Sequence, residues 1–197
     1  MRRANPRPTA RPVMNDRLSD AIDSTPDHGV TVRTFDESDR QIIAELYENG
    51  MLGGEAAPND TGADIDNIAE AYFDDPRHHF WLADVDGQTV GMIAVGSDED
   101  HTAEVRRLRV HPAFREKPVA SCLLETALEH CKDHGFLKIR LDTRYEKTSV
   151  LDLFERAGFQ LTRSRSSPGS KEVLEFYLDL YRQSDDDDAT PPMRGRA

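Results

Sequence analysis

A chain of 197 residues with 37% hydrophobic side chains can build one compact domain and is short for two. Its longest apolar runs span only a few residues, against the roughly 20 of a membrane-spanning helix, and no signal-peptide core follows the N-terminal arginines, so we expect a soluble, cytoplasmic protein with no membrane segment. The formal net charge of −12 repels nucleic acid and attracts cations, which predicts a basic small molecule or basic peptide as partner unless the charge serves only solubility.

Neither end of the chain carries the apolar residues of a core. Residues 1–28 are rich in Arg and Pro, and we expect them to form a disordered N-terminal extension. A targeting arm, a nucleic-acid contact and a true translation start at Met14 are the alternatives. Residues 184–197 contain a run of Asp and are expected to form a disordered acidic tail. One domain over residues 29–183 remains.

Within that domain, the hydrophobic pattern switches between the period of a strand and that of a helix. The predicted strands are 30–35, 79–84, 89–95, 102–110, 136–143, 159–165 and 173–180, with turns at Asp86-Gly87 and 166–170. The predicted helices are 38–50, 65–72, 118–134 and 150–157. The order β-α-α-β-β-β-α-β-α-β-β predicts an α/β fold with an α+β mixed sheet, in which strands 102–110 and 136–143 are parallel.

The strand 102–110 changes phase in its middle. Its apolar residues stand at odd positions before the change and at even positions after it, namely Ala103, Val105, Leu108 and Val110. Such a slip is typical of a β-bulge, which we place at Arg106-Arg107. The bulge is expected to splay the parallel pair and to leave backbone groups unpaired where α/β sheets bind ligands. A pantetheine arm carries two amides and could add there like a short strand.

The turn after this strand directs the N-terminus of helix 118–134 toward the same crevice. We expect Pro118 at the first helical position, where its missing N–H matters least. The backbone N–H groups of the turn, together with Arg115 and Lys117, are typical of a pyrophosphate site. The strand edge and the helix N-terminus therefore predict a binding site for a ligand that joins a pantetheine arm to a pyrophosphate, as coenzyme A (CoA) does.

Cysteine spacing argues against disulfide and metal chemistry. Cys122 and Cys131 both fall in helix 118–134, where nine residues separate them by about 13.5 Å. A disulfide needs Cα atoms within roughly 7 Å, so an intrachain bridge is excluded and both thiols are assigned to packing. The chain has no CxxC pair and no HExxH helix, so we predict no metal site.

The run Val-His-Pro-Ala-Phe-Arg at 110–115, leading into a helix, resembles the GNAT superfamily of N-acetyltransferases. The resemblance covers about residues 30–180, and the segments Ala-Gly-Phe at 157–159 and Leu-Asp-Thr at 141–143 support it. It implies a GNAT-like acyl-CoA-binding domain over 29–183 with a bulged, splayed central parallel strand pair. The implied activity is that of a transferase, an acyltransferase that moves an acetyl group from acetyl-CoA to a primary amine of a small molecule or peptide by direct attack.

The resemblance also implies the residues that hold acetyl-CoA. The loop that would bind the pyrophosphate consists of Arg115, Glu116, Lys117, Pro118, Val119 and Ala120. The strand residues that would hold pantetheine are Leu108, Arg109 and Val110. A backbone N–H near Leu108 would polarise the thioester carbonyl, as an oxyanion-hole donor does.

Glu104, just before the predicted bulge, is the candidate general base, at a position that several family members use to deprotonate the amine. The alternative is a solvated carboxylate paired with a neighbouring arginine. Asp142 is the second choice for a base, and His111 is expected to be a turn residue. His78 and His79 would either line the acceptor cleft or begin a strand.

Two features depart from the family pattern. Glu116 and Pro118 replace glycines of the pyrophosphate loop, and losing one charge-assisted hydrogen bond of about 1.5–3 kcal/mol predicts weaker coenzyme binding. Phe154 stands where many members have a Tyr that protonates the leaving thiolate, which predicts a slower enzyme or another acid. These departures keep open a non-catalytic acyl-CoA-binding or regulatory domain. The sequence leaves the acceptor, cationic or otherwise, and a homodimer undetermined.

Overall fold

The structure, a computed structural model, describes residues 29–52, 60–99, 101–143, 148–165 and 173–181. The predicted disordered ends, 1–28 and 184–197, and the predicted turn at 166–170 lie outside the described residues. No helix among the described residues is long and apolar enough to cross a membrane.

The described elements follow the predicted order closely. The strands are β1 (Val30–Thr34), β2 (His79–Val85), β3 (Gln88–Glu99), β4 (Thr102–Val110), β5 (Lys138–Thr143), β6 (Gln160–Arg165) and β7 (Val173–Asp179). The helices are α1 (Arg40–Asn49), α2 (Ala63–Asp66), α3 (Ile68–Phe73), α4 (Val119–Asp133) and α5 (Thr148–Arg156), with 3₁₀ turns η1 (Glu37–Asp39) and η2 (Pro112–Phe114).

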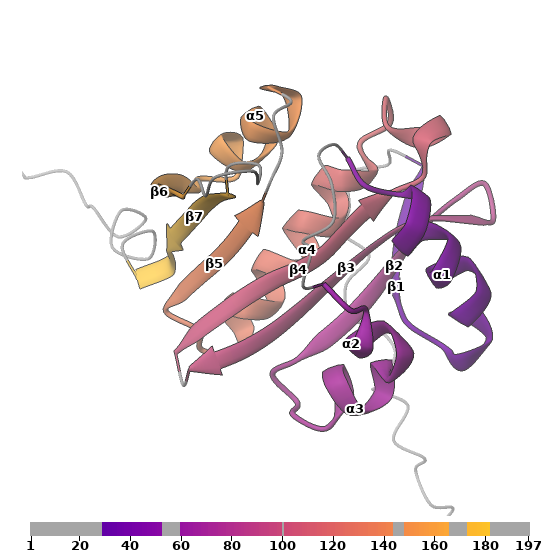
Figure 1. Cartoon of the computed structure of the whole chain (residues 1–197), viewed down its shortest axis with the longest axis horizontal. Coiled ribbons are helices and arrows are strands. Elements are labelled where there is room, and N and C mark those ends of the chain that lie inside the picture. Colours follow the sequence, from indigo (N-terminus) through magenta and orange to yellow (C-terminus); the bar gives the residue numbers. More distant parts are fainter. Residues whose placement is uncertain (1–28, 53–59, 100, 144–147, 166–172, 182–197) are drawn as a thin grey trace, which may run out of the picture.

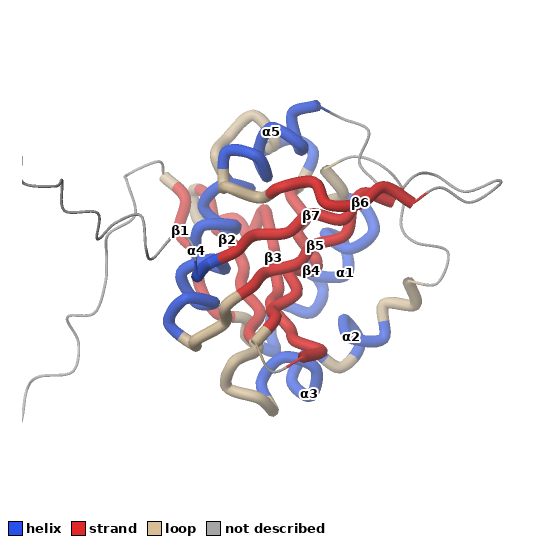
Figure 2. The backbone as a smooth tube through the Cα atoms, turned by 90° about the vertical axis from the view of Figure 1, so that its left-hand side faces the viewer, coloured by secondary structure: helices blue, strands red, loops and turns tan. Residues whose placement is uncertain are grey.

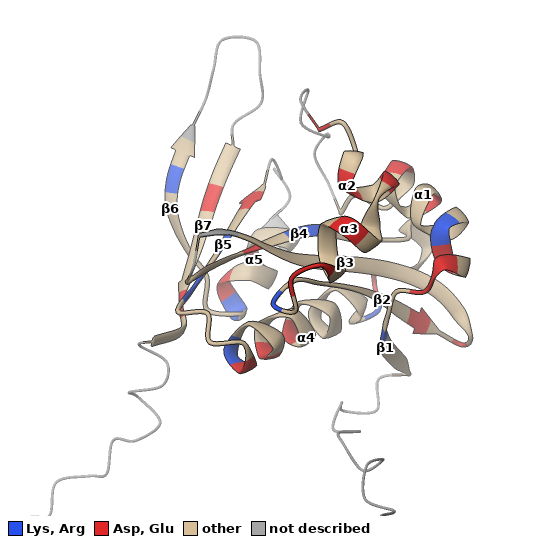
Figure 3. Cartoon of the chain, turned by 90° about the horizontal axis from the view of Figure 1, so that it is seen from below, with Lys and Arg blue, Asp and Glu red and all other residues tan. Residues whose placement is uncertain are grey.

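All seven strands form one sheet in the order β1-β2-β3-β4-β5-β7-β6. β4 and β5 are parallel, and the other neighbouring pairs are antiparallel. Helix α4 covers one face of the sheet, and α1, α2 and α3 cover the other (Figures 1, 2 and 3). This arrangement confirms the predicted mixed α/β fold.

The sheet separates two hydrophobic cores. The larger core lies between the sheet and helices α4 and α5, and it takes alternate residues of β4, including Val105, Leu108 and Val110. The smaller core lies under α1 and α3 and contains Met92 and Ala94 of β3. Because paired residues of neighbouring strands share a face, the partners of Met92 and Ala94 on β4 lie on the α1 side of the sheet.

Three local predictions were wrong. β3 extends to Glu99 instead of ending at 95, because the ladder with β4 continues through its acidic end, which composition alone assigns to a turn. The helix predicted at 65–72 is two short helices, since Asn67 leaves the helical conformation with φ −129° and ψ 53°. Pro118 is the N-cap of α4 and not its first helical residue, because its ψ is 25°.

Gly91 sets how closely α4 approaches the sheet. A Cβ at this position of β3 would lie 2.8 Å from Val119 Cγ1 and 2.9 Å from Leu123 Cδ1. Both of these α4 side chains are fully buried, so neither has room to move aside. A hydrogen in place of a side chain at 91 is therefore what lets the first turns of α4 pack on β3.

We expect Gly91→Ala to lower the free energy of unfolding by about 1–3 kcal/mol through overpacking. Gly96→Ala is the matched control on the same strand, because the nearest atom to its new Cβ would be Arg106 Nη1 at 4.0 Å. Urea denaturation of the two variants measures the difference. Equal stability of both variants would contradict the packing assigned to Gly91.

Candidate functional site

The parallel strands β4 and β5 pair only at their amino-terminal ends. The register contains Thr102 with Lys138, Ala103 with Ile139 and Glu104 with Arg140, and it stops there. Beyond this point β4 continues along β3, while β5 continues along β7 to Thr143. The two strands diverge toward their carboxyl ends (Figure 1). The predicted splay is confirmed.

A bulge in β4 stands at the point of divergence. Met92 pairs with Arg109 and Ala94 pairs with Arg106, so one residue of β3 faces two residues of β4, Arg107 and Leu108. Arg107 adopts a left-handed φ of 58°, which β-bulges commonly require of one residue. The bulge confirms the phase-slip argument, displaced by one residue from the predicted Arg106-Arg107.

The backbone after the bulge turns alternate amides toward the open edge of β4. The N–H of His111 donates to the Val90 carbonyl at 2.7 Å, so the neighbouring amide of Val110 points away from β3. That amide donates to the Gly50 carbonyl at 2.8 Å. Leu108, two residues earlier, faces the same edge, where no described strand pairs with β4. Of the predicted pantetheine residues, Leu108 therefore presents its backbone to the gap, whereas the Val110 N–H is already donated to Gly50.

The Arg107 side chain links the bulge to the helices above it. Its Nε and Nη2 donate to the two carboxylate oxygens of Asp64 at 2.8 and 2.5 Å, and its Nη1 donates to Asp60 at 2.6 Å. The hydroxyl of Tyr72 donates to the same Asp64. The guanidinium also lies over the ring of Tyr47, 5.2 Å from its centroid. We call Arg107, Asp60 and Asp64 the arginine clamp; α1 and α3 contribute the two tyrosines.

Charge pairing outweighs burial in the arginine clamp. Burial opposes the charge of Arg107, but the hydrogen bonds and charges of Asp64 and Asp60 more than compensate and raise its pKa. Burial likewise favours the neutral form of Asp64, and the bonds from Arg107 and Tyr72 reverse this and lower the pKa of that carboxyl. The clamp is therefore fully ionised at neutral pH.

Glu104, the candidate base, lies on the α1 side of the sheet as the last residue of β4 that pairs with β5. Its carboxylate forms an ion pair with Arg106, and Arg140 Nη2 lies 3.8 Å from the same oxygen. The structure thus brings Glu104 to the point of divergence, and it also places an arginine beside it, as the alternative interpretation requires.

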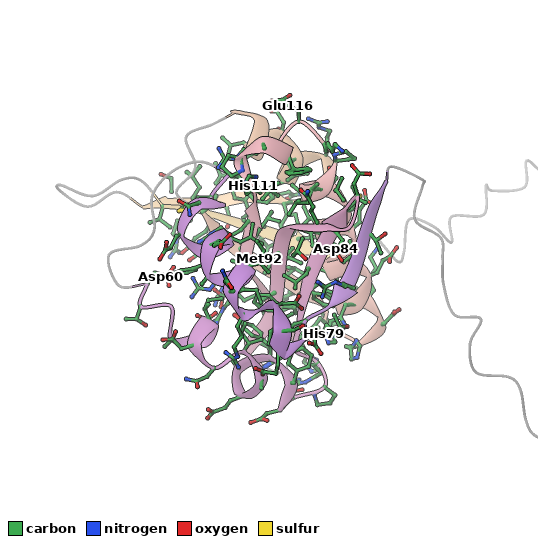
Figure 4. The ribbon with its side chains drawn as sticks, turned by 90° about the vertical axis from the view of Figure 1, so that its right-hand side faces the viewer. Asp60, His79, Asp84, Met92, His111 and Glu116 are labelled. Carbon is green, nitrogen blue, oxygen red and sulfur yellow. The ribbon has the colours of Figure 1, made fainter. Side chains whose placement is uncertain are left out.

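The turn before α4 holds the predicted pyrophosphate residues. Arg115 donates to the Met51 carbonyl at 2.5 Å and so joins this turn to the end of α1. Lys117 lies 3.5 Å from Asp86, and Glu116 is exposed. Figure 4 shows Glu116 at the tip of the turn. Pro118, the N-cap of α4, has no side chain that could accept a hydrogen bond from the first N–H groups of the helix, those of Val119 and Ala120.

The two histidines at and just before the start of β2 lie away from the bulge of β4, because β3 stands between these strands. His79 packs on the opposite face of the sheet, 5.5 Å from the ring of His130 on α4, and burial, with the charges of His130 and His134, lowers its pKa to about 4. In Figure 4, His111 lies in the upper part of the view, below Glu116, and His79 lies in the lower part. The ring of His78 contacts the Ser97 hydroxyl, and His78 directly precedes β2. Asp142 is exposed on β5, and His111 caps η2, as expected of a turn residue.

Phe154 lies inside the larger core. Its ring is 2% exposed and packs against Phe159 and Phe176. Phe154 therefore packs in the core, and its side chain has no proton to donate to a leaving thiolate. Cys122 and Cys131 are both buried and free, in agreement with their assignment to packing.

Two features of the site were missed by sequence reasoning. Asp60 and Asp64 lie more than forty positions from Arg107, and nothing in the local pattern pairs them with it. Arg109 is buried at 7% exposure, although arginine in a strand normally faces solvent. The available signal was the concentration of Arg106, Arg107 and Arg109 around the phase slip.

The arginine clamp makes a direct stability prediction. We expect Arg107→Gln to lower the free energy of unfolding by about 3 kcal/mol, because two partly buried carboxylates lose their counter-charge. Arg40→Gln is the control, since both members of its pair with Glu37 are exposed and a change below about 0.5 kcal/mol is expected. Urea denaturation at neutral pH measures both variants. A loss for Arg107→Gln as small as that of the control would contradict the clamp.

The sequence is similar to those of known N-acetyltransferases. The mouse N-acetylaspartate synthetase is 34% identical over 98 residues, which are 49% of this chain and 33% of that protein. Human N-acetyltransferase 8 is 28% identical over 104 residues, which are 50% of this chain and 46% of that protein. The chain thus matches between a third and a half of the length of these two relatives.

Solved structures share the fold at low identity. YncA of Salmonella typhimurium, solved with its cofactor acetyl-CoA, aligns with a TM-score of 0.65 at 21% identity and covers 84% of this chain and 99% of its own. A GNAT acetyltransferase of Staphylococcus aureus aligns with a TM-score of 0.65 at 19% identity, covering 77% of this chain and 99% of its own. The model of the acetyltransferase (GNAT) family matches residues 41–159. Because that match spans more than half of the chain, the protein belongs to the acetyltransferase (GNAT) family.

Proposed function

We propose that the protein is an acetyl-CoA-dependent N-acetyltransferase that acetylates a primary amine of a small molecule or peptide. The observation that carries the proposal is the bulged, splayed β4–β5 pair beside the N-terminus of α4, in a chain of this family. The open edge at Leu108 suits the amides of pantetheine, and the start of α4 suits a pyrophosphate. The residues present therefore fit acetyl-CoA.

Acetyl-CoA, when bound, supplies an acetyl thioester that an unprotonated amine can attack. In the proposed mechanism, the Leu108 N–H at the open edge of β4 donates to the thioester carbonyl oxygen and stabilises the negative charge that develops there. The N–H groups at the start of α4, with Arg115 and Lys117, hold the pyrophosphate, and Glu116 weakens this contact by like charge. Phe154 contributes apolar packing and no proton.

The protein's cysteines support direct attack over a covalent enzyme intermediate. Burial raises the pKa of the Cys131 thiol to about 12 and also raises that of Cys122. Both thiols are therefore protonated at neutral pH, and a protonated thiol is a poor nucleophile. The sequence contains no other cysteine that could act as a nucleophile.

Glu104 is proposed as the general base. The Glu104 carboxylate stands at the last position of β4 that pairs with β5, three residues before the bulge and on the α1 side of the sheet, from which an amine would approach the thioester. Its ion pairs with Arg106 and Arg140 hold it in place. The carboxylate would accept the amine proton either directly or through water.

The acceptor is proposed to be a primary amine. The overall charge of −12 favours a cationic one, whereas the similar N-acetylaspartate synthetases make aspartate a second acceptor worth testing. The cytoplasmic location, the lack of a nucleic-acid partner and a homodimeric state stay predictions from the sequence.

A second candidate function is a non-catalytic acyl-CoA-binding or regulatory domain. The observation that favours it is Phe154, which is buried in the core and which the family resemblance places where many members have a proton-donating Tyr. The exposed Glu116 in the pyrophosphate turn favours it as well.

One pair of measurements tests both functions. We expect acetyl-CoA at about 100 times its Kd to raise the Tm by roughly 5–10 °C, because a ligand that binds only the folded state stabilises it. We also expect release of free coenzyme A thiol with at least one amine of a panel that includes polyamines, amino acids and peptides. A thermal shift without thiol release would favour the non-catalytic domain. The absence of a thermal shift would overturn both functions.

The assignment of Glu104 is tested with the best acceptor of that panel. We expect Glu104→Gln to lower kcat by about 10²–10⁴-fold while the thermal shift with acetyl-CoA is retained. The deficit should shrink as pH rises, since more of the amine is then already deprotonated. Glu129→Gln, an exposed carboxylate on α4, is the control. Unchanged turnover in Glu104→Gln would assign this carboxylate to the ion pairs alone.

A further inference from the structure

Arg109 is a buried cation without a carboxylate partner among the described residues. Its side chain is only 7% exposed. Nη1 donates to the Leu108 carbonyl at 3.1 Å, and Nε has no hydrogen-bond partner within the described residues. A buried guanidinium in this state is unfavourable unless an anion pairs with it.

The other arginines on the same face of β4 are matched by carboxylates. Arg106 pairs with Glu104, and Arg107 pairs with Asp60 and Asp64. The acidic side chains described next to the bulge are thus already engaged. Arg109 follows Arg107 by two residues, and its guanidinium lies on the α1 side, 6.0 Å from the centroid of the Tyr47 ring.

The guanidinium also lies beside the open edge of β4. The Leu108 carbonyl that it contacts belongs to the open edge of β4, from which β5 has diverged. Arg109 therefore adjoins the strand edge proposed to hold pantetheine, and it does so from the α1 side, the face on which Glu104 also lies. With Nη1 held by Leu108, the Nε side of the guanidinium is the side left to bind a ligand.

We propose that Arg109 binds a carboxylate of the acceptor, so that the acceptor is a small amine carrying a carboxylate, as an amino acid does. The inference rests on the proposed N-acetyltransferase function and names the substrate class of that same site. A carboxylate accepts two parallel hydrogen bonds from one edge of a guanidinium, which satisfies Nε and supplies the missing counter-charge. This proposal replaces the cationic acceptor expected from the overall charge, because the local charge of Arg109 at this edge is positive.

The test compares acceptors that differ only in the carboxylate. Thiol release is measured with aspartate against its diamide and with alanine against alaninamide, in the wild-type protein, Arg109→Gln, Arg109→Lys and Arg40→Gln. Arg40 is an exposed arginine at the start of α1, so its variant controls for the loss of one positive charge. The ratio of kcat/KM for acid over amide is compared between proteins, which cancels the different basicity of the two amines.

We expect Arg109→Gln to lower the acid-over-amide ratio by about ten- to a hundredfold from its wild-type value, mainly through KM for the acid. Arg109→Lys should lower the ratio less, and Arg40→Gln should leave it at the wild-type value. An equal loss for acid and amide in Arg109→Gln, which leaves the ratio unchanged, would overturn the inference, since the guanidinium would then act on the thioester.

Binding measurements separate the inference from the function on which it rests. Calorimetric titration of aspartate into the protein with free coenzyme A reports the carboxylate site without turnover. Binding that Arg109→Gln abolishes, with no thiol release from any amine, would uphold the carboxylate site and overturn the transferase. Turnover whose acid-over-amide ratio does not depend on Arg109 would uphold the transferase and overturn the carboxylate site. If Arg109→Gln fails to fold, the change of the ratio between the wild type and Arg109→Lys decides the question.

Discussion

The arginine clamp is the interaction on which the arrangement of the site depends. The smaller core packs α1 and α3 on β2 and β3, and Arg107 adds a polar link from this layer to the bulge of β4. Its backbone takes a left-handed conformation in the bulge, while its side chain binds Asp60 and Asp64 and lies over Tyr47. One residue thus connects the divergence of the strands to the helical layer that faces it.

Backbone conformation and side-chain charge act together at this point. The bulge turns Leu108 toward the open edge, and the same turn places Arg109 on the α1 side of the sheet. Glu104 remains on that side, before the bulge. A hydrogen-bond donor, a candidate base and an unmatched cation consequently gather around one gap, although the chain as a whole carries a net charge of −12. Overall charge is therefore a poor guide to the acceptor of this site.

Much of the fold could be predicted because the pattern of apolar residues is local. The phase slip between Val105 and Leu108 revealed the bulge to within one residue, since an extra residue in a strand moves every later apolar side chain from odd to even positions. Contacts between distant segments were beyond that reasoning. The pairing of Arg107 with Asp64, and the donation from Val110 to Gly50, depend on where α1 and α2 settle, which no local period encodes.

Gly91 has a consequence that reaches beyond packing. The side chain closest to it belongs to Val119, the first residue of α4, so the glycine acts as a spacer that fixes the height of the helix N-terminus above the sheet. In the proposed function, opposite parts of one extended ligand, acetyl-CoA, reach the amides of that N-terminus and the open edge of β4. The missing side chain at Gly91 is then one determinant of the distance that this ligand spans.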